Sequence, residues 1–269
     1  MSDSTKRSSW PVPLPPSVRG EIRGQIAILT LTRPEKRNAL NEEAGRGMQL
    51  FFATLPKEIR GVVLHGEGDN FCAGLDLNEL KEASAAEGIE ASINGQRIND
   101  IIQYAKVPVI AVLHGAVIGA GLELAAAAHI RVAESTAYYA LPEGMRGIFL
   151  GSGGSVRLPR LIGTQTVMDM MLTGRTLDVA EGHALKISQY LVEPGAGLAK
   201  AIALAERIAT NAPLANFAII QALPRIMEQD PSTGLFMETL MVSIAQADDE
   251  AKNRLRDFLD RKKNKVTRD

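Results

Sequence analysis

Residues 109–124 read VIAVLHGAVIGAGLEL, and this stretch decides the fold. Its first five residues are apolar and predict a buried strand over Val109–Leu113. A turn rich in glycine follows, and an alanine-rich helix is expected over residues 121–128. A second short strand pair is expected next, ending near Glu143. Strands and helices that alternate in this way indicate an α/β fold.

Two carboxylates lie in this otherwise apolar region. Glu123 falls in the first turn of the expected helix, and Glu143 follows twenty residues later (143 − 123). Two glutamates held close together and away from water cannot both ionise easily, so one could act as a base and the other as an acid. Simpler alternatives stay open. Glu123 could be a first-turn residue favoured by the helix dipole, and Glu143 could pair with Arg146 at the surface.

The start of the expected helix also offers backbone donors. A helix N-terminus has unpaired N–H groups, and Gly119 and Gly121 would let a ligand approach the N–H of Ala120. The loop FCAGLD at residues 71–76 is a second place where an N–H meets a helix start. Two such donors converging on one carbonyl oxygen would form an oxyanion hole. Taken alone, the glycine-rich turn could equally be a plain packing turn, and the loop is better explained as a simple capped turn than as a site.

Composition excludes several other classes of protein. The net charge of −1 shows no basic surface for nucleic acid or membrane. Cys72 is the only cysteine, so neither an intramolecular disulfide nor a thiolate metal cluster can form. No apolar run reaches the ~18 residues that a membrane span needs. The four histidines show no metal spacing. We therefore expect a cytoplasmic globular protein without a metal and without a nucleic-acid or membrane partner.

The expected elements divide the chain into three parts. Residues 1–19 are rich in Ser and Pro and are expected to form a poorly ordered tail. Residues 20–196 predict an α/β core in which strand–strand–helix units recur. Residues 197–269 show only helical patterns. Within the core, Asn41 is expected to cap a helix over residues 42–55, and Asp76 a helix over residues 77–83.

Arginines 157 and 160 follow a second glycine cluster, GSGG at residues 151–154. Charged residues next to a glycine-rich turn usually face solvent. We therefore expect Arg157 and Arg160 to lie on a solvated face.

Three segments together resemble the crotonase (enoyl-CoA hydratase/isomerase) superfamily. They are LTRPEKRNAL at residues 31–40, FCAGLD at residues 71–76 and IAVLHGAVIGAGLEL at residues 110–124. The resemblance runs from about Ile26 to the C-terminus. It implies a spiral of ββα turns and a C-terminal helical region that builds a homotrimer or a dimer of trimers. It also implies an acyl-CoA substrate and no separate cofactor, because coenzyme A is part of the substrate.

The resemblance assigns roles to particular residues. Ala73 and Ala120 would donate their N–H groups to the thioester carbonyl. Glu123 would help activate a water for attack on C3, and Glu143 would deliver a proton to C2. Phe258 or Lys262, from this or a neighbouring subunit, would close the CoA groove. The remaining positions implied for substrate or CoA binding are Arg37, Ala39, Leu40, Gly74, Leu75, Asp76 and Gly119.

The chain departs from the common family pattern at several positions. Ala120 replaces a glycine, His129 stands where an aspartate is common, and Leu150 replaces a frequent proline. Arg146 could lower the pKa of Glu143 if it lies in the pocket.

The function expected from the resemblance is hydration of a trans-2-enoyl-CoA. A double-bond isomerase that uses Glu143, an acyl-CoA hydrolase and a non-catalytic acyl-CoA-binding protein remain alternatives.

Overall fold

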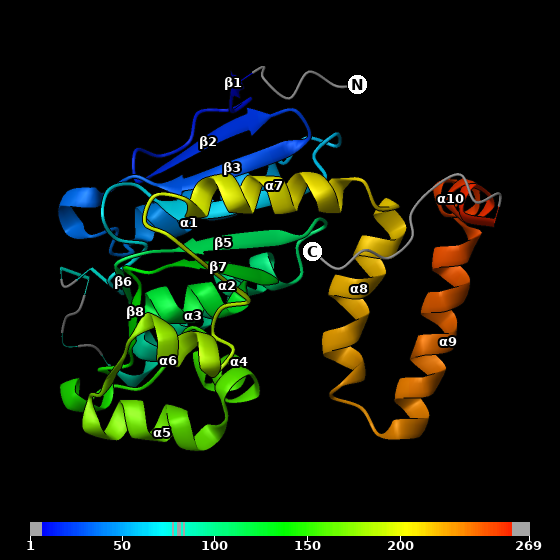
Figure 1. The fold of residues 1–269 in the computed structure, drawn as a ribbon. Helices are drawn as coiled ribbons and strands as arrows, with labels where there is room; N and C mark the ends of the chain where they lie inside the picture. The colour runs from blue at the N-terminus through cyan, green and yellow to red at the C-terminus, as the bar shows by residue number, and fades with distance from the viewer. Residues whose placement is uncertain (1–6, 77, 80–81, 83, 260–269) are drawn as a thin grey trace.

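A seven-stranded sheet forms the centre of the molecule (Figure 1). The computed structural model describes residues 7–76, 78–79, 82 and 84–259. The strands lie in the order β1–β2–β3–β4–β5–β7–β10; β1, β2 and β3 pair antiparallel, and the pairs from β3 to β10 are parallel. Their bounds are β1 (Arg7–Ser9), β2 (Val18–Arg23), β3 (Ile26–Leu31), β4 (Gly61–Gly66), β5 (Val109–Leu113), β7 (Ile130–Glu134) and β10 (Tyr190–Val192).

A second, three-stranded sheet contains β6 (Ala116–Ile118), β8 (Tyr138–Ala140) and β9 (Thr176–Leu177). The α-helices are α1 (Glu42–Ala53), α2 (Ala85–Gln103), α3 (Ala120–Ala127), α4 (Gly154–Ile162), α5 (Thr164–Thr173), α6 (Val179–Ala184), α7 (Gly197–Ala209), α8 (Pro213–Ile226), α9 (Pro231–Ala247) and α10 (Asp249–Leu259). Two short 3-10 helices are η1 (Pro34–Lys36) and η2 (Gly144–Arg146).

Strand–strand–helix units recur along the chain, as β2–β3–α1, β5–β6–α3 and β7–β8–α4. In the last two units the first strand joins the large sheet and the second strand joins the small one. The loop after β4 takes a similar path, because Cys72 forms a bridge with Val117 of β6. This repetition confirms the predicted crotonase-like spiral with a helical C-terminal region.

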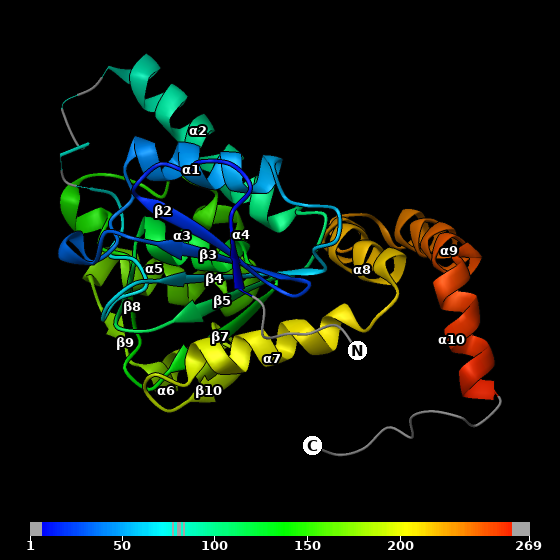
Figure 2. The same ribbon diagram turned by 90° about the horizontal axis from the view of Figure 1, so that it is seen from above.

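Apolar residues cover both faces of the large sheet. Ala201 and Ala205 of α7 pack on β-branched residues of β3, β4, β5 and β7. The larger cluster on the other face includes Met48 and Phe51 of α1 and reaches the helices around α3. Helix α7 lies on one side of the large sheet and α1 on the other (Figure 2). Strands β3, β4, β5 and β7 are buried along almost their whole length, which is the usual state of parallel strands and explains their continuous apolar runs.

The N-terminal expectation is wrong for residues 7–19. Arg7–Ser9 form β1 on the edge of the large sheet. Trp10 is 8% exposed, stacks on Phe51 at 4.0 Å between ring centroids and donates its indole N–H to Thr54. The Ser- and Pro-rich composition did not predict that Trp10 is buried, because a single buried tryptophan can fix a segment whose average composition is polar. Residues 1–6 lie outside the described part.

The boundaries of several helices also differ from the prediction. Asn41 caps α1 as expected, with its side chain accepting the N–H of Ala44. Asp76 instead caps a turn: its side chain accepts the N–H of Asn78, and no helix forms at the described residues 78, 79 and 82. Residues 77, 80, 81 and 83 lie outside the described part. The helix that follows begins at Ala85, where Ser84 and Glu87 form a capping box.

The three C-terminal helices stand beside the core in both views (Figures 1 and 2). α8 packs on α9, and the side chain of Gln221 reaches the carbonyl of Ala105. These helices expose large apolar side chains, including Phe217, Leu223, Leu235 and Phe236. Among the described residues, no helix is both long and apolar enough to cross a membrane.

Candidate active site

The start of α3 is built around Gly119. Its φ of 53° lies in the left-handed region, which glycine adopts without strain. A Cβ at this position would lie 2.6 Å from Oε1 of Glu143, so the missing side chain also leaves room for that carboxylate. The N–H of Gly119 donates to Ala140. The next N–H, that of Ala120, has no hydrogen-bond partner within the described part of the chain.

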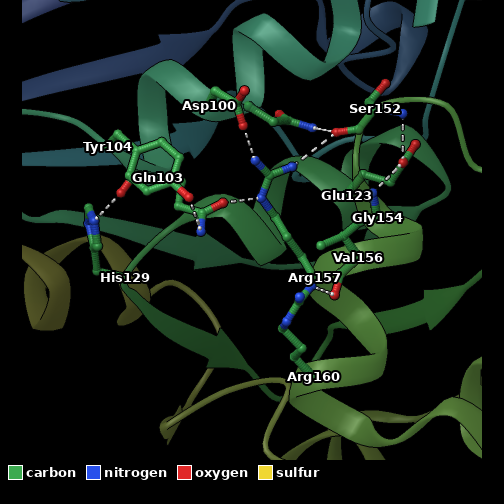
Figure 3. A network of polar contacts seen from close by, with 11 residues as sticks. Asp100, Gln103, Tyr104, Glu123, His129, Ser152, Gly154, Val156, Arg157 and Arg160 are labelled. Atoms are coloured by element: carbon green, nitrogen blue, oxygen red, sulfur yellow. Dashed lines mark hydrogen bonds and ion pairs between the residues drawn. The ribbon is translucent and has the colours of Figure 1, made fainter. Parts of the chain in front are cut away.

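Glu123 points into the protein. It is 3% exposed, and its Oε1 accepts the N–H groups of Ser152 at 2.9 Å and Gly154 at 2.8 Å (Figure 3). Burial raises the pKa of Glu123, and the two N–H bonds and the charge of Arg157 oppose that shift without cancelling it. Glu123 is therefore more than a first-turn residue stabilised by the helix dipole.

Glu143 is also buried, at 7% exposure, and begins η2. Among the described residues, its Oε2 has no hydrogen-bond partner. Burial raises the pKa of Glu143, and the nearby charge of Glu123 raises it further. Arg146 is exposed, forms no ion pair with Glu143 among the described residues and lowers that pKa only in part. The surface pairing considered for Glu143 is therefore wrong.

The two carboxyl groups affect each other electrostatically, and both pKa values are raised. Ionisation of either group therefore makes ionisation of the other less favourable. Two buried carboxyl groups of this kind, one protonated and the other ionised, could move protons at a carbon centre.

The loop at residues 71–76 lies against the start of α3. Its N–H groups at Phe71 and Cys72 donate to the carbonyls of His114 and Ala116, and Ile118 donates to Cys72. A Cβ on Gly74 would lie 3.8 Å from the nitrogen of Ala120. The structure thus brings together the two segments that were predicted to supply the oxyanion donors.

One of those donors is already bonded. The N–H of Ala73 donates to the carbonyl of Arg37 at 2.9 Å. Arg37 and Asn38 both have left-handed backbones, with φ of 50° and 55°. A substrate oxygen could accept from Ala73 only by sharing this bond or displacing the Arg37 carbonyl. Sequence could not reveal this contact, because it depends on the dihedral angles of Arg37 and Asn38.

The positions expected to line the CoA groove are assembled by two loops. Leu40 donates to Gly74 and accepts from Asp76, which places residues 39–40 beside residues 74–76. Leu75 is 46% exposed beside this junction. Arg33, which was not among the predicted site residues, pairs with Asp76 at 2.6 Å and donates to Ala39. The hydrogen bond from Arg33 lowers the pKa of Asp76. Asp76 therefore joins the two loops.

Two of the expected positions, Phe258 and Lys262, lie near the C-terminus. The side chain of Phe258 and all of Lys262 lie outside the described residues. The helix that carries Phe258, α10, lies beyond α8 and away from α3 in both views (Figures 1 and 2).

Arg157 is the main site residue that the sequence reasoning misplaced. It is 9% exposed instead of solvated, and it bonds Asp100, Gln103 and the carbonyl of Ser152 (Figure 3). Arg160 is exposed as predicted. The Arg157 partners Asp100 and Gln103 belong to α2 and lie 54 to 57 residues earlier in the chain, so no local pattern could reveal these two contacts.

His129 makes a structural contact in place of the common aspartate. Its Nδ1 accepts the N–H of Val109, and its Nε2 lies 3.0 Å from the carbonyl of Gln103. Burial lowers the pKa of His129, in keeping with a neutral ring that joins the end of α2 to β5.

Comparison with known proteins agrees with this geometry. The family described as Enoyl-CoA hydratase/isomerase matches residues 21–268. A short-chain-enoyl-CoA hydratase of Clostridium acetobutylicum is 31% identical over 90% of this chain and 94% of its own length. The crystal structure of a proposed enoyl-CoA hydratase from Rhodopseudomonas palustris is 55% identical, with a TM-score of 0.89 over 93% of this chain and 98% of that chain.

A further structure, a proposed enoyl-CoA hydratase of Thermobifida fusca in complex with CoA, is 27% identical, with a TM-score of 0.80 over 86% of this chain and 93% of that one. The match to the family covers almost all of the spiral core and the helical region. This chain therefore belongs to the enoyl-CoA hydratase/isomerase family.

Proposed function

We propose that this protein adds water across the C2=C3 double bond of a trans-2-enoyl-CoA. The observation that carries the proposal is the pair of buried glutamates with raised pKa values at the N-terminus of α3. The names of the relatives support the same reaction, and the CoA bound to the Thermobifida fusca protein supports a CoA thioester as substrate.

In the proposed mechanism, the thioester oxygen accepts a hydrogen bond from the N–H of Ala120. The N–H of Ala73 becomes a second donor once the Arg37 carbonyl gives way. Ionised Glu123 takes a proton from a water, and the oxygen of that water bonds to C3. The electrons of the double bond move to the thioester as an enolate, and protonated Glu143 then gives its proton to C2. Each oxyanion donor of this kind is typically worth about 2.7–4 kcal/mol in the transition state.

An isomerase is the second candidate, and one observation favours it. Glu143 has a buried oxygen that no described residue bonds, whereas one oxygen of Glu123 is held by two N–H groups. Glu143 alone could therefore carry a proton from C4 to C2 of a 3-enoyl-CoA.

The exposed apolar side chains of α8 and α9 support an oligomer, which we propose to be a trimer or a dimer of trimers.

The test is hydration of a short trans-2-enoyl-CoA, followed by loss of the conjugated thioester absorbance. Glu123→Gln and Glu143→Gln should each lower kcat by about 10²–10⁴, the usual contribution of a general acid or base. Glu90→Gln changes an exposed glutamate of α2 and should leave kcat unchanged. Turnover of a 3-enoyl-CoA without hydration, retained in Glu123→Gln, would assign the isomerase instead. Inertness towards both substrates would reject both proposals.

A further inference from the structure

The direction of the Glu123 carboxylate is set by backbone groups of another segment. Its Oε1 is fixed by the N–H groups of Ser152 and Gly154, which belong to the loop before α4 and its first residue. If this segment shifts, both donors move and the carboxylate loses its direction. The segment is held in turn by contacts on its carbonyl oxygens.

Helix α2 supplies part of that support. Asn99 donates to the carbonyl of Ser152 at 2.8 Å, and Ser92 donates to the carbonyl of Gly151 at 2.6 Å. A Cβ on Gly95 would lie 2.5 Å from Oγ of Ser152, so α2 packs tightly on the loop.

Arg157 supplies the other part. Its Nη1 donates to the carbonyl of Ser152 at 3.2 Å, its Nη2 pairs with Asp100 at 2.5 Å and its Nε donates to Gln103 at 2.5 Å (Figure 3). A Cβ on Gly153 would collide with the same guanidinium group. One planar group therefore ties the loop to α2 in three directions, which an ammonium group on a single flexible stem cannot reproduce.

We propose that Arg157 is a positioning residue for Glu123: it fixes the Ser152 carbonyl and so aims the Ser152 and Gly154 N–H groups at the Glu123 carboxylate. The role in turnover rests on the proposed function, whereas the positioning itself does not. Arg157 contacts neither reacting atoms nor, in any hydrogen bond of the described residues, the Glu123 carboxylate itself. It acts through the loop and through its charge.

The charge effect has a definite sign. The charge of Arg157 from α4 acts on Glu123, and the charge of Glu123 in turn raises the pKa of Glu143 at the start of η2. Arg157 favours the ionised form of Glu123, as do the two N–H bonds. Loss of Arg157 should therefore raise the pKa of Glu123 and move the acidic limb of the kcat/KM profile to higher pH.

The experiment compares Arg157→Gln, Arg157→Lys and Asp100→Asn with Arg160→Gln. Arg160 lies one turn away on α4, is exposed and makes no contact with the Ser152 segment in the described structure. We expect Arg157→Gln to lose about 10²-fold in kcat with little change in KM, which is the scale of a misplaced catalytic group. Arg157→Lys should recover part of the lost kcat. The acidic limb of its kcat/KM profile should lie between those of the wild type and Arg157→Gln. Arg160→Gln should match the wild type.

Hydrogen exchange of the Ser152 and Gly154 amides, measured by mass spectrometry, gives a readout that does not need turnover. Both amides should exchange faster in Arg157→Gln and not in Arg160→Gln. Wild-type exchange rates in a folded Arg157→Gln variant would overturn the proposal, as would a wild-type kcat and acidic limb.

Asp100→Asn should fold even if Arg157→Gln does not, because Asp100 is half exposed. In that case the exchange rates of the Ser152 and Gly154 amides in Asp100→Asn test the proposal. If the wild type hydrates no enoyl-CoA, the proposed function fails and the exchange rates alone test the positioning role.

Discussion

Gly154→Ala isolates the placement of Glu123 from the rest of the fold. A Cβ on Gly154 would lie 2.7 Å from Oε1 and 3.0 Å from Cδ of Glu123, and closer still to its Cγ. Contacts of this kind cannot persist, so the Glu123 side chain has to move. The backbone itself tolerates alanine, because Gly154 is the first residue of α4.

The size of the effect follows from two opposing terms. Overpacking a buried site costs about 1–3 kcal/mol. Alanine in a helix gains up to about 1 kcal/mol over glycine. We therefore expect a net loss of about 0–3 kcal/mol in stability. The loss in kcat should be far larger in proportion, about 10²-fold, because a displacement near 1 Å is enough to misplace a catalytic group.

Gly88→Ala is the matched control. Gly88 lies on the exposed side of α2, and a Cβ there would meet nothing within 4 Å. This variant should gain about 1 kcal/mol and raise the Tm by about 2–4 °C with unchanged kcat. Thermal denaturation and enoyl-CoA hydration measure the two quantities. A Gly154→Ala protein that behaves like Gly88→Ala, with raised Tm and full activity, would refute the placement of Glu123 against this helix.

Two further predictions concern stability. Burial lowers the pKa of His65 from 6.5 to about 4, so between these values the unfolded chain binds a proton that the folded protein does not. Neutral His65 should contribute up to about 3 kcal/mol to the free energy of unfolding, in full above pH 6.5 and progressively less as the pH drops towards 4. Urea denaturation at both ends of this pH range should show a smaller fall in stability for His65→Gln than for the wild type. An equal fall in the two proteins would contradict this. Trp10→Ala should cost about 3–5 kcal/mol, because it removes the stack on Phe51, whereas Trp10→Phe should lose only about 1 kcal/mol for the Thr54 bond. If the Trp10→Ala protein is as stable as the wild type, residues 7–10 do not anchor the N-terminal segment to the core.

Much of the fold could be predicted because it rests on local patterns. The apolar run at residues 109–113 became a buried central strand, and Asn41 capped the helix that follows it. Short segments of this kind record their own burial, since each residue type is chosen for its immediate surroundings. Averaged composition was a poorer guide, as Trp10 shows.

The candidate site divides in the same way. Glu123 and Glu143 were predicted from their positions beside the glycine turn, and the structure shows that both are buried. The oxyanion loops were also predicted, and the structure brings them together. Whether the N–H donors of these loops are free or already bonded was not predicted, because the Ala73 N–H donates to a carbonyl 36 residues away (73 − 37).

The sequence by itself determined the α/β spiral, the helical C-terminal region and the two glutamates, because strand periodicity, glycine turns and helix caps act over a few residues. Only the tertiary structure decided which groups surround those glutamates. Arg157 became a buried clamp because α2 offers Asp100 and Gln103 to it, and Arg37 reached Ala73 because two left-handed residues turn its carbonyl inward. Partners far apart in the chain are set by its path through space, and a local pattern carries no record of that path.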